Sequence, residues 1–164
     1  EATRAGTPPF AQLLVYPPTD VATPWPSRAR FGAGLLLTEA DRRAFTAHYL
    51  GASRTPVEDP RISPLRAPDL HALPPALVVT AHFDLLRDEG EAYAAALAAA
   101  GTPARTLRLP DVGHGFVNLT GVSPAARRAW RDVALAWRAL LDGTATDAGG
   151  HVAPMDAAAT ASAP

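Results

Sequence analysis

Residues 73–90 read Leu73-Pro-Pro-Ala-Leu-Val-Val-Thr-Ala-His-Phe-Asp84-Leu-Leu-Arg-Asp-Glu-Gly90, and this segment carries most of the information about the fold. Its apolar run, residues 76–81, contains two β-branched valines and follows two prolines, which is typical of a strand buried on both faces. Acidic residues then gather after Asp84, where a helix macrodipole favours negative charge, and an alanine-rich segment runs on to Gly101. The sequence therefore predicts a strand, a turn that holds Asp84, and a helix.

A second strand is predicted over residues 104–109, followed by the loop Pro110-Asp-Val-Gly-His114-Gly-Phe116. A right-handed β-α-β crossover makes the two strands parallel and brings their C-terminal ends to one edge of the sheet. Neighbouring strands lie about 4.8 Å apart, so we expect Asp84 and His114 to meet in a hydrogen bond at this edge. Ligands of open α/β sheets bind there. Asp111 is an alternative partner for the histidine, but we expect it to shape the turn.

Three motifs occur in a fixed order: Tyr16-Pro-Pro-Thr-Asp20, the Asp-x-Leu-x-Asp-Glu-Gly run that begins at Asp84, and His114-Gly-Phe. In them the chain resembles the C-terminal part of the α/β-hydrolases of the hormone-sensitive-lipase-like esterase and lipase group. The resemblance implies an α/β fold, with parallel strands, flanking helices and a partial helical cap. It also implies hydrolysis of a small-molecule carboxylic ester through an acyl-enzyme, without cofactor or metal. Asp84 would then orient the imidazole and His114 would be the general base.

The nucleophile of such a triad should precede Asp84 in a Gly-x-Ser-x-Gly elbow, and the sequence contains no such motif. Ser27, Ser53 and Ser63 precede Asp84, but none lies between a predicted strand and a predicted helix. Residues 1–72 also lack a His-Gly-Gly loop that would supply an oxyanion hole. We therefore expect a C-terminal fragment of a hydrolase, inactive by itself. The alternative is a non-catalytic protein of the same fold, either a truncated remnant or a small-molecule binding scaffold, although the retained histidine disfavours an evolved receptor.

The resemblance assigns residues 21–50 to the cap. Within them, Thr38-Glu-Ala-Asp41 is typical of a helix start, and the helix is predicted to run from Glu39 to Leu50 and to end at Gly51. Four aromatic residues of this region are candidates to line an acyl-binding site, with ordinary packing as the alternative for each: Trp25, Phe31, Phe45 and Tyr49.

The hydrolase-like part is expected to span residues 1–142. Its last helix is predicted to have Ser123 as N-cap and Pro124 at its first position, with an apolar stripe from Trp130 to Leu141. Residues 143–164 are almost free of bulky side chains and are expected to form a disordered tail. The strand at residues 13–16 would lack an upstream neighbour, so its edge could support self-association.

Composition limits the remaining possibilities. The 164 residues carry 15 basic side chains, all of them arginine, against 16 acidic ones, and the net charge of −1 gives no electrostatic basis for binding nucleic acid. No stretch is long and apolar enough to span a membrane. The composition is typical of a bacterial protein, and the absence of cysteine leaves the compartment open, with the cytoplasm as our expectation. His71 and His82 are irregularly spaced relative to Asp84, so we expect no metal site.

Overall fold

The computed structural model describes residue 6 and residues 9–143. Most of the predicted tail, residues 144–164, lies outside the described residues. The elements in chain order are β1 (Gln12–Val15), α1 (Pro26–Phe31), α2 (Glu39–Leu50), η1 (Pro64–Arg66), β2 (Ala76–Phe83), α3 (Arg87–Ala99), β3 (Ala104–Gly113), η2 (Phe116–Leu119) and α4 (Pro124–Leu141).

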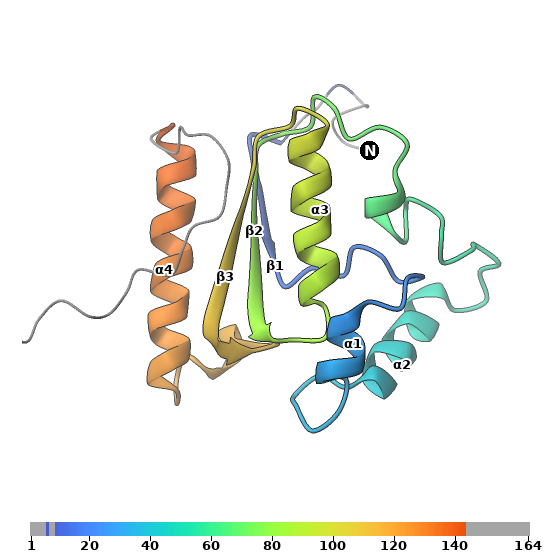
Figure 1. Cartoon of the computed structure of the whole chain (residues 1–164), viewed down its shortest axis with the longest axis horizontal. Helices are drawn as coiled ribbons and strands as arrows, with labels where there is room; N and C mark the ends of the chain where they lie inside the picture. The colour runs from blue at the N-terminus through green and yellow to red at the C-terminus, as the bar shows by residue number, and fades with distance from the viewer. Residues whose placement is uncertain (1–5, 7–8, 144–164) are drawn as a thin grey trace, which may run out of the picture.

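The strands form a parallel sheet in the order β1-β2-β3. Helix α3 covers one face of this sheet and α4 covers the other, while α1 and α2 lie together beyond the C-terminal end of β2 (Figure 1). The predicted β-α-β unit is thus confirmed, with Ala76 paired to Ala104 at its start and Phe83 paired to Gly113 at its end.

Strand β2 is buried on both faces because helices pack on each side of it. Leu77, Val79 and Ala81 lie in the cluster that includes Val133 of α4. On the opposite face, a second cluster contains four buried residues, Leu70, Ala76, Tyr93 and Leu97. The continuous apolar run of the sequence therefore reflects burial from two directions.

Two strand ends differ from the sequence expectation. The β2–β3 ladder resumes after an irregularity between Ala81 and Phe83, so both strands continue beyond their predicted ends. Asp111 consequently lies within β3, exposed, and the expectation that it shapes a turn is wrong. The cause is tertiary: pairing with β2 overrides the tendency of Pro110 to end a strand.

Helix α2, in the predicted cap segment, residues 21–50, has the predicted bounds. Thr38 accepts a hydrogen bond from the backbone of Asp41, whose side chain accepts one from the backbone of Thr38, and the helix ends at Gly51. None of the residues of α2, all of which are described, is fully buried. This helix therefore lies on the core without contributing to it.

Helix α4 begins as predicted, with Ser123 accepting a hydrogen bond from the backbone of Ala126 and Pro124 at the first position. Val133 is buried, whereas Trp130 and Leu141 remain 39% and 38% exposed. The predicted apolar stripe is thus wider than the surface that the sheet covers. In the described part of the chain, no helix has the length and hydropathy needed to cross a bilayer.

Candidate active site

The candidate site is built around the side chains that follow β2 and β3. Nδ1 of His114 lies 2.9 Å from Oδ2 of Asp84, and Oδ1 of Asp84 accepts a hydrogen bond of 2.9 Å from the backbone of Leu86. Asp84 is 1% exposed, whereas the side chain of His114 is 22% exposed. The carboxylate is therefore fixed through both oxygens, and the imidazole is both oriented and accessible.

The loop that holds His114 depends on two glycines. Gly115 has a φ of +75°, a conformation that L side chains rarely adopt. A Cβ on Gly113 would lie 3.1 Å from the carbonyl oxygen of Phe83, in the neighbouring strand. These positions let the chain turn closely past β2, which brings the histidine to the carboxylate.

This geometry selects a chemistry for the imidazole. A neutral imidazole that donates from Nδ1 to Asp84 leaves Nε2 as the acceptor. The arrangement can therefore take a proton at Nε2 of His114 while Asp84 stabilises the resulting positive charge, as in general-base catalysis.

Tyr16 packs against the imidazole from the end of β1. Its ring centroid lies 4.5 Å from that of His114 and 5.6 Å from that of Phe116. Burial, and then the charge of Asp84, raise the pKa of the Tyr16 phenol. Tyr16 also has a φ of +42°, which is unfavourable for a residue with a Cβ.

A cavity of about 600 Å³ opens beside this pair, with Tyr16 and His114 in its wall. Phe45 and Tyr49 of α2, two of the four aromatic candidates, also line it. The other lining residues are mostly apolar: Val15, Pro18, Val21, Leu37, Arg42, Thr46, Arg61, Ile62, Pro64 and Leu86. The cavity thus lies between α2, the end of β1 and His114.

Trp25 and Phe31, the other two aromatic candidates, are not among the residues that line this cavity. Phe31 is 8% exposed and packs in the cluster of Leu37, Leu85 and Leu86. Ordinary packing, the alternative reading of the aromatic residues, thus applies to Phe31, because α1 turns it toward the start of α3.

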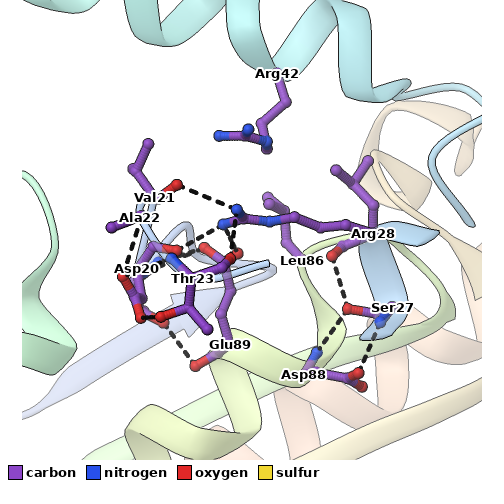
Figure 2. A network of polar contacts seen from close by, with 12 residues as sticks. Asp20, Val21, Ala22, Thr23, Ser27, Arg28, Arg42, Leu86, Asp88 and Glu89 are labelled. Atoms are coloured by element: carbon purple, nitrogen blue, oxygen red, sulfur yellow. Dashed lines mark hydrogen bonds and ion pairs between the residues drawn. The ribbon is translucent and has the colours of Figure 1, made fainter. Parts of the chain in front are cut away.

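A buried polar network joins the cap segment to α3 (Figure 2). Glu89 is 0% exposed and accepts a hydrogen bond of 2.6 Å from Nη2 of Arg28. Its other oxygen accepts from the backbone amides of Thr19 and Asp20, in the segment that follows β1. Burial raises the pKa of Glu89, although Arg28 opposes this effect. The carboxylate of Glu89 therefore links α3 to α1 and to the segment that follows β1.

Arg28 extends the network to the cap segment. Its guanidinium donates to the backbone carbonyls of Asp20, Val21 and Thr23. Beside it, Ser27 donates to the carbonyl of Leu85 and accepts from the backbone of Asp88. This network sets the position of Val21, which lines the cavity.

The three upstream serines have their hydroxyls engaged elsewhere. Ser27 belongs to the network just described, and Ser63 donates to the carbonyl of Val57 and accepts from the backbone of Val21. Ser53 is exposed and bonds to Thr55. Each hydroxyl thus has a structural role in the residues that the structure describes.

Local sequence motifs contain some of these structural residues, but not their partners. Glu89 lies in the acidic run after Asp84, and Tyr16 lies in the Tyr-Pro motif, but their partners, Arg28 and His114, are distant in sequence.

His82, in β2, packs against Phe83, with ring centroids 4.7 Å apart. Residue 6 and residues 9–143 contain no group of three or more potential metal-ligating side chains.

The sequence profile of the α/β-hydrolase fold matches residues 1–118. The chain belongs to the α/β-hydrolase fold family. Carboxylic ester hydrolase LipN of Mycobacterium tuberculosis is 43% identical over 136 residues, covering 83% of this chain and 36% of LipN. Lipase 2 of a Moraxella species is 40% identical over 114 residues, covering 70% of this chain and 26% of the lipase.

Solved structures of this family agree with the fold. A thermostable esterase from Pseudomonas putida superimposes with a TM-score of 0.72 and 40% identity, covering 80% of this chain and 43% of the esterase. A hyperthermophilic esterase from Pyrobaculum calidifontis gives a TM-score of 0.74 at 34% identity, covering 85% and 45%. The chain thus spans about a third of these curated relatives and under half of these solved chains.

Proposed function

We propose that this α/β-hydrolase chain supplies the acid and the base of a serine-dependent carboxylic-ester hydrolase. The observation that carries the proposal is the hydrogen bond between Asp84 and His114, with the imidazole in the wall of a largely apolar cavity. The names of the relatives, a carboxylic ester hydrolase and a lipase among them, support ester hydrolysis as the reaction class.

The nucleophile and the oxyanion donors would come from a segment outside this chain. In the complete site, Nε2 of His114 would take the proton of a serine hydroxyl as the serine attacks the ester carbonyl. The protonated imidazole would then give that proton to the leaving alcohol. Water would then attack the acyl-enzyme with His114 again as the base, which releases the carboxylic acid and returns the proton to the serine. Asp84 would stabilise the imidazolium in both acylation and deacylation.

The test compares the chain alone with a chimera. Residues 1–164 alone should show no turnover of a p-nitrophenyl ester and no labelling of serine by a fluorophosphonate, because the base has nothing to activate. Fusing the part of LipN that precedes its similarity to this chain to residue 1 should restore both. Turnover by the chain alone would contradict the proposed absence of a nucleophile.

Variants of the chimera test the two assigned roles. His114→Ala should lower kcat by about 10⁶-fold and Asp84→Asn by about 10⁴-fold, as in other serine triads. His71→Ala is the matched control, because His71 is exposed in the loop that precedes β2, beside Gly101 and before the start of β3, whereas His114 follows the end of β3. Its turnover should not change. A labelled chimera that keeps its turnover after His114→Ala would overturn the assignment. A chimera that binds esters in the cavity without labelling or turnover would favour a binding scaffold.

We also propose that the isolated chain self-associates through β1. This strand is an edge of the described sheet, and it is apolar and only partly buried, so its outer backbone groups can pair with another chain. Sedimentation velocity over a range of concentrations should show association that grows with concentration. A monodisperse monomer with a sharp cooperative melt would contradict this proposal.

A further inference from the structure

Tyr16 is the residue of the candidate site whose position the proposed reaction does not explain. Its ring contacts the imidazole of His114 with an interplanar angle of 52° and meets Phe116 edge-on, at 84°. Asp84 holds one edge of the imidazole, and Tyr16 packs on its ring. The hydrogen bond at Nδ1 fixes one atom of the imidazole but still allows the ring plane to tilt about that bond. The contact with Tyr16 limits this tilt.

The backbone around Tyr16 is arranged to present this ring. Its amide donates to the carbonyl of Val79 at 2.7 Å, which ties the residue to β2 just after β1 ends. Its φ of +42° is a conformation that glycine adopts far more readily than a residue with a side chain. A strained conformation at this position, kept with a large aromatic side chain on the cavity wall, indicates that the ring itself has a role.

We propose that Tyr16 is a positioning residue for His114, holding the imidazole in the orientation in which Nδ1 faces Asp84 and Nε2 faces the cavity. This inference rests on the proposed function, because it matters only where His114 acts as a base. The phenol hydroxyl is not required by it, since the contact uses the face and edge of the ring. Phenylalanine should therefore replace Tyr16, whereas a residue without a ring should not.

The test is nuclear magnetic resonance of the full chain, following the Nδ1–H proton of His114, which should give a downfield signal when it is bonded to Asp84. Tyr16→Phe should keep this signal, and Tyr16→Gly should lose it, although glycine suits the positive φ. Tyr49→Leu is the matched control, because Tyr49 lines the same cavity and should leave the signal in place. A signal retained in Tyr16→Gly would overturn the proposal.

A second readout works at micromolar concentration, where association is reduced. Modification by diethyl pyrocarbonate, mapped by mass spectrometry, should speed up at His114 in Tyr16→Gly but not in Tyr16→Phe. His48, His71 and His82 are internal references whose rates should stay constant, and a rise at all of them would show unfolding and overturn a local role for Tyr16. Loss of the signal in Asp84→Asn separates the two hypotheses: if it persists there, the proposed acid–base pair fails, whatever Tyr16 does.

Discussion

The two sides of the candidate site depend to different extents on apolar packing and on a buried ion pair. The sheet with α3 and α4 is stabilised by apolar packing around β2, whose residues from Ala76 to Ala81 are at most 3% exposed. The predicted cap segment, residues 21–50, contains α2, which has no fully buried residue. It is joined to α3 through the buried pair of Arg28 and Glu89, and its Phe31 and Leu37 also pack on Leu85 and Leu86, just before α3. Asp84 and His114 follow strands of the packed sheet, whereas much of the cavity wall belongs to the predicted cap segment. Substitutions in the sheet and substitutions in the ion pair should therefore damage different parts of the site.

The largest expected effect comes from breaking the buried pair. Glu89→Gln leaves the guanidinium of Arg28 buried without a countercharge, which should lower the free energy of unfolding by about 3–5 kcal/mol. Glu91→Gln is the matched control, because its pair with Arg108 is partly exposed and should contribute only about 0–1 kcal/mol. Denaturant titrations of the variants measure both, and equal losses would contradict the distinction.

Hydrogen exchange would show where this damage falls. In Glu89→Gln, the amides of the cap segment should lose protection while those of β2 keep theirs, because the apolar clusters do not depend on the ion pair. Uniform loss of protection would mean that the two regions unfold as one unit.

A core truncation tests the apolar side. Leu97 is 0% exposed on α3, so Leu97→Ala should cost about 2–5 kcal/mol through lost burial and the resulting cavity. Leu135→Ala, on α4, removes the same atoms from a side chain that is 63% exposed, and should change stability by no more than about 0.5 kcal/mol. Thermal unfolding monitored by circular dichroism compares the pair, and similar midpoints would argue against a packed core around Leu97.

The helix cap gives a smaller and more local effect. Thr38→Ala removes the acceptor for the backbone amide of Asp41 and should destabilise α2 by about 1 kcal/mol, whereas Thr38→Ser should keep the bond. Since α2 contributes no buried residue, exchange should speed up in this helix first. An equal effect on β2 would show tighter coupling of cap and sheet than the packing indicates.

The smallest effect is a pH dependence carried by Glu39. Hydrogen bonds from Arg42 and then Arg43 lower the pKa of Glu39 to about 2, against the opposing effect of partial burial, from an ordinary value of 4.5. Its contribution is complete above pH 4.5 and is lost as the pH falls toward 2, since the unfolded chain binds the proton first. Glu39→Gln should therefore be less stable than the parent chain at neutral pH and nearly equal to it near pH 2. A difference that stays constant with pH would contradict this account.

Local sequence patterns predicted the elements well where interactions between residues close in sequence determine them. The capping residues Thr38 and Ser123 start their helices as predicted, because a cap bond joins residues three apart. The apolar run of β2 and the placement of Asp84 after it also follow from local pattern. The meeting of Asp84 and His114 followed from the handedness of the crossover, which is a general rule of chain geometry.

Other features depended on contacts between distant segments. Trp25 and Phe31 were candidate pocket residues, but packing turns Phe31 onto Leu85 and Leu86, and the cavity wall excludes both aromatic residues. Asp111 lies within a strand because β3 pairs with β2 again beyond Pro110, where Gly113 is paired to Phe83. No local pattern encodes which side chain a distant neighbour will cover.

The sequence by itself determined the family, the parallel β-α-β unit and the pair of residues at its edge, because hydrophobic period, caps and motif order are local properties of the chain. Only the tertiary structure decided that Glu89 fastens the cap through Arg28 and that Tyr16 packs on His114. These pairs are 61 and 98 residues apart in sequence (89 − 28 and 114 − 16), and buried charges and ring contacts form only when the fold brings such segments together.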